Sequence, residues 1–223
     1  MWHEIVVTEV TLYGPKLRCV AGFDRRLGRM VRPEPVAGGF WPAIVCGPNT
    51  TFHPGHVVRF RGETPDTAMP HRTEDVVVTG NPYRSGVLSA VEFKTVLARA
   101  ADISVEAAFG PHLVFEGAKA YAPADSPCGS LACETALVER LGLSELVFGD
   151  ERRLKLDIEL RGHKLLLPVG AKDLKQAFQK EGLDDAKALL PERGLCQVRL
   201  GLARPFDAAP DRCYLQVNGI HAL

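Results

Sequence analysis

Cationic side chains are concentrated in one short stretch near the start of the chain. Between positions 14 and 35 the sequence holds six lysines and arginines against two carboxylates, Asp24 and Glu34. Guanidinium groups bind phosphate oxygens through directed, charge-assisted hydrogen bonds, so a cluster of them is suited to a polyanion such as nucleic acid. The six cations are Lys16, Arg18, Arg25, Arg26, Arg29 and Arg32.

Two short apolar runs carry most of these cations. They cover residues 17–22 and 29–32, and the polar connector between them ends at Gly28. Two β-prone runs joined by a short connector that contains glycine predict a β-hairpin. We expect Pro33 and Pro35 to stop the second strand, because proline has no N–H to donate to the ladder.

A β-surface that binds single-stranded nucleic acid combines cationic side chains with aromatic rings on which bases stack. This hypothesis predicts that Arg18, Arg29 and Arg32 share an exposed surface with at least one aromatic side chain. The alternative is that the arginines pair with carboxylates or line a solvated edge strand, where charge prevents aggregation. The candidate residues for nucleic-acid binding are Arg18, Arg25, Arg29, Arg32, Trp41, Arg59, Phe60 and Arg61, with Arg26 and Phe40 beside them.

A histidine followed closely by two carboxylates forms a second candidate site, at His71, Glu74 and Asp75. Such a group could serve acid–base chemistry, and in a cleft between two domains it could gather Asp173 as well. The alternative is that Glu74 or Asp75 pairs with an arginine of the predicted hairpin, with Arg32 as the expected partner. We favour this structural role over catalysis.

Other catalytic and metal-binding patterns are missing from the sequence. Cys128 and Cys133 are the only close cysteine pair, and four residues separate them, whereas structural zinc sites use closer pairs and four ligands. No Gly-x-Ser-x-Gly elbow and no phosphate-binding glycine motif occurs. We therefore predict no metal and no cofactor, and favour binding over catalysis.

The composition is that of an ordinary globular protein. The 223 residues are 46% apolar and 24% charged, and the formal net charge is zero, so any nucleic-acid surface must be local. No secretory signal is visible at the start, and the longest apolar runs are too short to cross a bilayer. We expect a cytoplasmic protein with no membrane partner, whose six cysteines are reduced and mostly buried.

Several predicted elements lie in the first half of the chain. Short strands are expected around residues 5–7, 56–61 and 74–79, with a loop rich in glycine and proline over residues 36–55. After these strands, apolar residues recur at helical spacing and predict a helix. The start of this helix has a capping box formed by Ser89 and Glu92. A short helix is also predicted over residues 104–109.

In the second half of the chain some elements are predicted clearly and one segment is ambiguous. Residues 131–141 could form a helix, although an extended segment near residues 129–131 is the alternative. The clearest prediction is a β-hairpin made by residues 153–160 and 164–169. Helices over 171–180 and 184–190 and strands over 195–202 and 213–220 complete the chain. The sequence thus predicts a mainly β protein with helical connectors, a β-rich α+β fold of two OB-like β-barrels packed together.

This organisation is supported by a resemblance at both ends of the chain. The matching residues are Thr8, Thr11, Cys19, Ala21, Gly22, Gly28, Arg32 and Pro33, then Pro70, His71, Glu74 and Asp75, and finally the segment Cys213–Leu223. In these positions the sequence resembles the dual OB-containing domain family, bacterial proteins proposed to carry two OB-like barrels. The resemblance implies nucleic-acid or nucleotide binding and no defined reaction.

Three functions remain open from the sequence. The first is a non-catalytic binding module for single-stranded nucleic acid or a nucleotide. The second is a small-ligand sensor or enzyme with its site between the barrels, and the third is an accessory domain for a protein partner. The expected domains are an N-terminal barrel over 1–85, a helical or irregular connector over 86–145 and a C-terminal barrel over 146–223.

Overall fold

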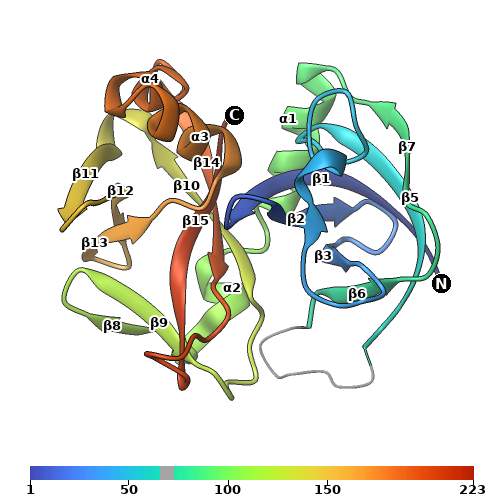
Figure 1. Ribbon diagram of the computed structural model, residues 1–223, viewed down its shortest axis with the longest axis horizontal. Helices are drawn as coiled ribbons and strands as arrows, with labels where there is room; N and C mark the ends of the chain where they lie inside the picture. The colour runs from blue at the N-terminus through green and yellow to red at the C-terminus, as the bar shows by residue number, and fades with distance from the viewer. Residues whose placement is uncertain (66–72) are drawn as a thin grey trace.

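The computed structural model describes residues 1–65 and 73–223, which fold into a mainly β protein with helices between the strands (Figure 1). The predicted β-rich α+β fold class is therefore confirmed. Within the described residues the strands form sheets of seven, five and three strands. The seven-stranded sheet makes up an N-terminal half, and the other two sheets make up a C-terminal half beside it.

The N-terminal half is built on a closed ring of strands. Strand β1 (Trp2–Tyr13) pairs with β2 (Leu17–Asp24), which pairs with β3 (Arg29–Glu34). Strand β3 lies parallel to β6 (Asp75–Val78), and β6 pairs with β5 (His56–Glu63). Strand β5 then pairs with β1, so the ladder returns to its first strand and closes a barrel.

The predicted basic hairpin is present as β2 and β3. Its connector ends at Gly28, whose φ of +64° suits a residue without a Cβ. One detail differs from the prediction, because β3 runs through Pro33 and ends at Glu34, before Pro35. Pairing of β3 with β2 stops at Val31, so Pro33 interrupts no hydrogen bond on that side.

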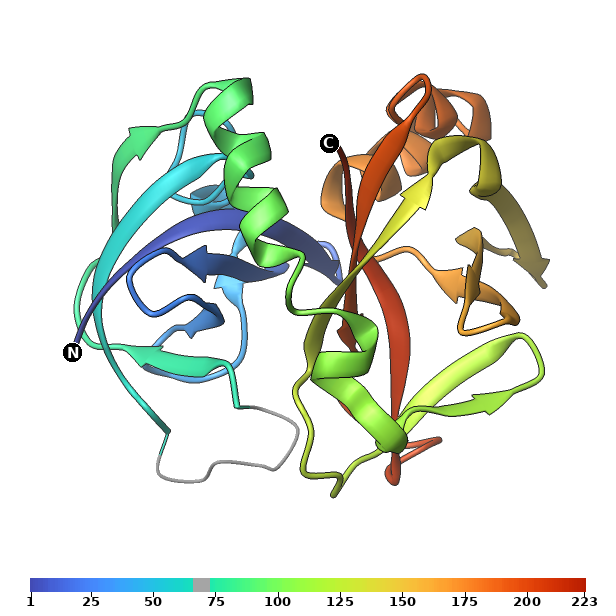
Figure 2. The ribbon, with the colours of Figure 1, turned by 180° about the vertical axis from the view of Figure 1, so that it is seen from behind.

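The remaining elements of this half cover the barrel. Strand β4 (Trp41–Pro42) and a 3-10 turn (Ala43–Val45) lie within the predicted loop, and β7 (Tyr83–Val87) extends the sheet beside β5. Helix α1 (Ala90–Ala100) begins after Ser89, and the capping box is present as predicted. Its buried residues Val96 and Ala100 pack against side chains of the barrel, and Figure 2 shows the helix lying across the barrel from behind.

A five-stranded sheet forms the centre of the C-terminal half. Its order is β10 (Leu131–Leu137), β14 (Leu195–Leu202), β15 (Arg212–Ala222), β9 (Lys119–Pro123) and β8 (Val114–Glu116). The helix considered for residues 131–141 is wrong, because every residue of β10 pairs in register with β14. Pairing with a strand far along the chain overrides the local helix preference of its alanines and glutamate.

The predicted hairpin of the second half is confirmed as β12 (Glu151–Leu160) and β13 (His163–Pro168), with β11 (Gly142–Phe148) beside β12. Apolar side chains of this sheet and of the five-stranded sheet share one core. Helices α3 (Lys172–Lys180) and α4 (Leu183–Ala188) follow β13, close to their predicted positions.

The segment expected as a connector is divided between the two halves. Helix α1 packs on the N-terminal barrel, whereas α2 (Val105–Phe109), which begins after its N-cap Ser104, contributes to the C-terminal core. Strands β8, β9 and β10 also belong to the C-terminal half. Two more 3-10 turns, Gly110–His112 and Val138–Arg140, complete the described elements.

Candidate functional site

Arg32 lies inside the protein, between the two halves. Only 6% of its surface is exposed. One guanidinium nitrogen donates to Asp75 over 2.9 Å, and the other donates to the Ser130 hydroxyl over 2.6 Å. Burial opposes the charge of Arg32, but nearby Cys19 and the carboxylate of Asp75 raise its pKa above the usual range. Arg32 is therefore a structural cation.

Glu74, which precedes Asp75 in the sequence, completes this buried network. Its carboxylate accepts hydrogen bonds from the backbone N–H and hydroxyl of Ser130, at 2.9 and 3.0 Å, and from the N–H of Leu131 at 3.2 Å. The predicted pairing of Asp75 with Arg32 is confirmed. Glu74, Ser130, Arg32 and Asp75 together join β3 and β6 to the start of β10.

The alternative acid–base site is not assembled by the described residues. Glu74 and Asp75 are buried and engaged as above. Asp173 lies in the first turn of α3, exposed and 3.7 Å from the ammonium of Lys172, far from β6 in Figure 1. His71 lies outside the described residues.

The other inward-facing candidates are also structural. Arg18 is 5% exposed, and its guanidinium donates to the backbone carbonyl oxygens of Leu17 and Pro15. Trp41 is buried, and its indole N–H donates to the Pro33 carbonyl over 2.7 Å. Phe60 is buried in the barrel core. The predicted exposed surface shared by Arg18, Arg29 and Arg32 is therefore wrong.

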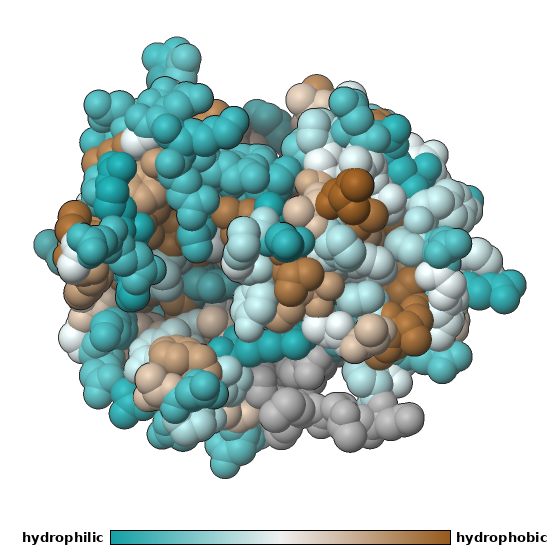
Figure 3. Space-filling view, viewed as in Figure 1, coloured by the Kyte–Doolittle hydropathy of each residue, from teal (hydrophilic) through white to brown (hydrophobic). Residues whose placement is uncertain are grey.

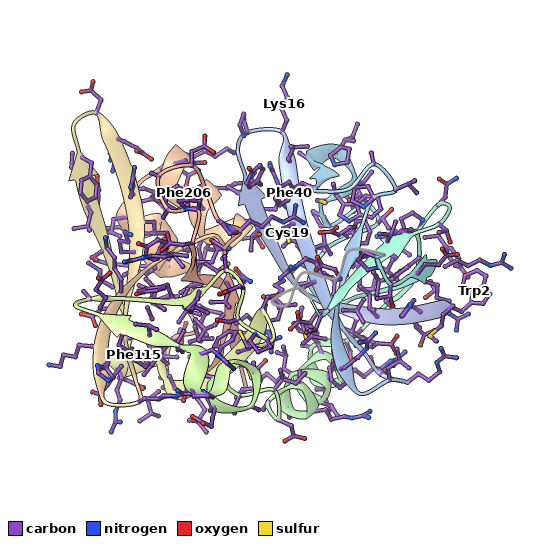
Figure 4. All side chains as sticks on the ribbon, turned by 90° about the horizontal axis from the view of Figure 1, so that it is seen from below. Trp2, Lys16, Cys19, Phe40, Phe115 and Phe206 are labelled. Atoms are coloured by element: carbon purple, nitrogen blue, oxygen red, sulfur yellow. The ribbon has the colours of Figure 1, made fainter. Side chains whose placement is uncertain are left out.

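The C-terminal half explains the burial of Arg32, because it covers one face of the β2–β3 hairpin. Arg204 pairs with Glu34, and its guanidinium lies over the ring of Phe40 at 4.7 Å. Arg199, fully buried, donates to Glu9 over 3.3 Å. Figure 4 shows Phe40 and Cys19 where the two halves face each other.

The exposed arginines gather at the opposite end of the N-terminal barrel, around two aromatic side chains. Trp2 is 49% exposed and Tyr83 is 47% exposed. In the sheet register Trp2 lies opposite Arg61, whose guanidinium is 4.9 Å from the ring, and Tyr83 lies opposite Arg59. Figure 4 shows Trp2 pointing away from the C-terminal half.

We call this surface the Trp2 face. Its hollow, of about 400 Å³, is lined by Trp2, His3, Glu4, Arg26, Arg59 and Tyr83. Arg26 donates to the Trp2 carbonyl over 2.8 Å. Arg29 is exposed and close enough to His3 to help burial lower the pKa of that imidazole. The face consists of Trp2, Tyr83, Arg25, Arg26, Arg29, Arg59 and Arg61.

Glu4 is the carboxylate that organises these arginines. It accepts from Arg25 over 2.7 Å and from Arg59 over 2.5 Å. Partial burial disfavours the Glu4 charge, but these two hydrogen bonds lower its pKa below the usual value. One carboxylate thus neutralises part of a local excess of guanidinium charge, and the remainder faces solvent.

The cysteines do not form a reactive or metal-binding centre in the described part of the chain. All six are free, and burial raises the pKa of every thiol, to about 12 for Cys46 and about 11 for Cys213. Thiols of this kind are poor nucleophiles at neutral pH. No group of three metal-ligating side chains occurs among the residues described.

None of the described helices has the length and apolar character needed to cross a membrane. No protein-family model and no curated protein matches the sequence. The resemblance to the dual OB-containing domain family remains a prediction, and the function is inferred from the geometry of these surfaces.

Proposed function

We propose that the N-terminal half is an OB-type barrel that binds single-stranded nucleic acid at the Trp2 face, without catalysis. The OB fold is a five-stranded Greek-key barrel. Strands β1, β2, β3, β6 and β5 pair in that order, and β5 pairs back with β1. This ring supports the assignment of the N-terminal half to the OB type.

The observation that carries the proposal is the register of the two exposed aromatic residues. Trp2 on β1 lies opposite Arg61, and Tyr83 on β7 lies opposite Arg59. Both arginines are on β5, which lies between β1 and β7 in one sheet. Bases stack on exposed rings, and guanidinium groups beside them neutralise the phosphates that connect those bases. Each ring on this face has an arginine next to it.

The position of this face differs from the usual one in OB barrels, where ligands lie across strands 2 and 3. Here one face of the β2–β3 hairpin is committed to the C-terminal half through Arg32 and Glu34, and only the tip of the hairpin, with Arg25, Arg26 and Arg29, belongs to the Trp2 face. A ligand of the N-terminal barrel must therefore use another surface. The Trp2 face fits because it is exposed, cationic and aromatic.

A single strand fits this face better than a duplex. Bases must be unstacked to lie on Trp2 and Tyr83, and a duplex keeps its bases inside. Because the whole chain has no net charge, attraction comes from the local arginines alone, and affinity should fall steeply with salt.

The experiment is a fluorescence-anisotropy titration with labelled single-stranded DNA, single-stranded RNA and duplex, at low and high salt. Loss of one stacking platform costs about 1–3 kcal/mol, so Trp2→Ala should weaken binding by about 5-fold to 150-fold. Arg61→Ala should weaken binding and reduce the salt slope by about one.

Phe148→Ala is the matched control for Trp2→Ala. Phe148 is 56% exposed, and the guanidinium of Arg153 lies 5.1 Å from its ring, much as Arg61 lies against Trp2. This control should bind like the wild type. Absence of binding at low salt, or an equal effect of the two variants, would overturn the proposal.

A further inference from the structure

A cavity of about 610 Å³ opens in the C-terminal half, between the β12–β13 hairpin, α3 and the loop over residues 203–209. Its volume lies within the range of small-molecule sites. Figure 3 shows a hollow on this side of the molecule, with a hydrophilic rim around a more apolar floor. The cavity belongs to the opposite half from the Trp2 face.

The rim of this cavity is strongly cationic. Five lysines and arginines line it against one carboxylate, Glu151. Arg153 pairs with Glu151 over 2.5 Å, and Arg152 pairs with Glu145, outside the cavity lining, over 3.0 Å. The other three cations form no ion pair with any residue that the structure describes. These unpaired cations are Lys119, Lys155 and Lys175.

Lys155 is the most constrained of the three. It sits on β12 between buried Leu154 and Leu156, and its half-buried side chain lines the cavity. Burial, together with the charges of Arg153 and Lys119, lowers its pKa. An anion between the lysines would remove this electrostatic conflict, because it favours the charged form of each ammonium.

Apolar and aromatic groups form the other side of the cavity. Phe206 is 53% exposed on the loop, and its ring lies 6.1 Å from that of Tyr214. Leu166 and Pro168 of β13 continue the apolar lining, and Gln179 adds an amide from α3. An exposed phenyl ring and an amide that line one cavity offer stacking and hydrogen bonding to a flat heterocycle.

We propose that this cavity binds a mononucleotide, with its phosphate among Lys119, Lys155 and Lys175 and its base against Phe206. Ammonium groups bind phosphate as point charges, which suits a cluster of three lysines from three separate elements. The volume of about 610 Å³ limits the ligand to a small molecule. The Trp2 face, in contrast, is an open surface for a strand.

Isothermal titration calorimetry with AMP, adenosine and inorganic phosphate tests the proposal. AMP should bind with a Kd of about 1 mM or tighter, and adenosine or phosphate alone should bind at least about tenfold more weakly. Lys155→Met and Lys175→Met should each weaken AMP binding by about tenfold or more. Lys180→Met, at the exposed end of α3, is the matched control and should bind AMP like the wild type.

A second pair of variants separates this site from the Trp2 face. Phe206→Ala should weaken AMP binding, whereas Trp2→Ala should leave it unchanged while it weakens oligonucleotide binding. The proposal is overturned if none of AMP, GMP, CMP and UMP binds. It is also overturned if Lys155→Met binds AMP as Lys180→Met does, or if Trp2→Ala abolishes AMP binding. Circular dichroism of each variant checks that it is folded.

Discussion

Arg32 and Asp75 face each other across the parallel pair of β3 and β6 and form a buried ion pair of 2.9 Å. The same arginine donates to Ser130, which follows it by 98 positions in the sequence. One side chain therefore closes the N-terminal barrel and also ties it to the C-terminal half. Breaking this buried ion pair is more costly than loss of an exposed pair.

Arg32→Met should reduce the free energy of unfolding by about 3–5 kcal/mol, because it breaks the buried ion pair with Asp75 and removes the hydrogen bond to Ser130. Arg61→Met is the matched control at an exposed position and should change stability by about 0.5 kcal/mol or less. Urea denaturation followed by circular dichroism measures both. Equal stability of the two variants would contradict the structural role of Arg32.

A second buried pair joins the halves at Glu9 and Arg199. Arg199→Met should cost about 3–5 kcal/mol, because it leaves the Glu9 carboxylate buried and unpaired. The double variant with Glu9→Gln should lose about 0.5–3 kcal/mol less stability than the sum of the losses in the two single variants, and this difference is the coupling energy. A double-mutant cycle by urea denaturation gives this value. Additive effects would mean that the two side chains do not interact.

The sequence predicted local features well. The basic hairpin, the Ser89 capping box and the β12–β13 hairpin each depend on residues close together in the chain. The pairing of Arg32 with Glu74 or Asp75 was also anticipated, as a contact that would fix the closure of the barrel, and Asp75 is the partner found. Strand β10 was not predicted, because its partner β14 lies more than fifty positions away.

The candidate site could be predicted only in part. Alternation along β2 and β3 shows that residues point to two faces, but not that a second half covers one of them. Arg18 and Arg32 therefore appeared equivalent to Arg61. Trp2 was missed, although the alternation of exposed Trp2 with buried His3 and Ile5 was a usable signal. The position of Arg61 beside Trp2 results from the pairing of β1 with β5.

Acid should destabilise the protein through His221. Burial lowers the pKa of its imidazole from 6.5 to about 4. In the native structure the ring N–H donates to the Thr8 carbonyl over 2.7 Å. Between these values the unfolded chain takes up a proton that the native state does not, so stability falls as pH falls. The full shift corresponds to roughly 3 kcal/mol, which partial exposure of the ring reduces to about 1–2 kcal/mol.

His221→Gln keeps a donor near Thr8 and removes the titrating group. The free energy of unfolding of this variant should depend less on pH between 6.5 and about 4 than that of the wild type. Urea denaturation at a series of pH values measures the difference. An unchanged slope would show that His221 does not carry this effect.

Lys155→Met should stabilise the ligand-free protein by about 0.5–1 kcal/mol, because it removes a half-buried ammonium next to Arg153 and Lys119. Lys180→Met on the exposed end of α3 should be close to neutral. Thermal and urea denaturation in buffer without phosphate compare the two. Loss of stability in Lys155→Met would mean that the lysine charge is already satisfied in the protein.

The two tryptophans allow the most direct test of the proposed nucleic-acid surface. An ¹⁵N–¹H correlation spectrum has one indole signal from exposed Trp2 and one from buried Trp41, and the Trp2→Ala variant assigns them. Titration with a single-stranded DNA of about eight nucleotides, within the range of OB site sizes, should shift the Trp2 signal and leave the Trp41 signal in place. A shift of Trp41 alone, or of neither signal, would contradict binding at the Trp2 face.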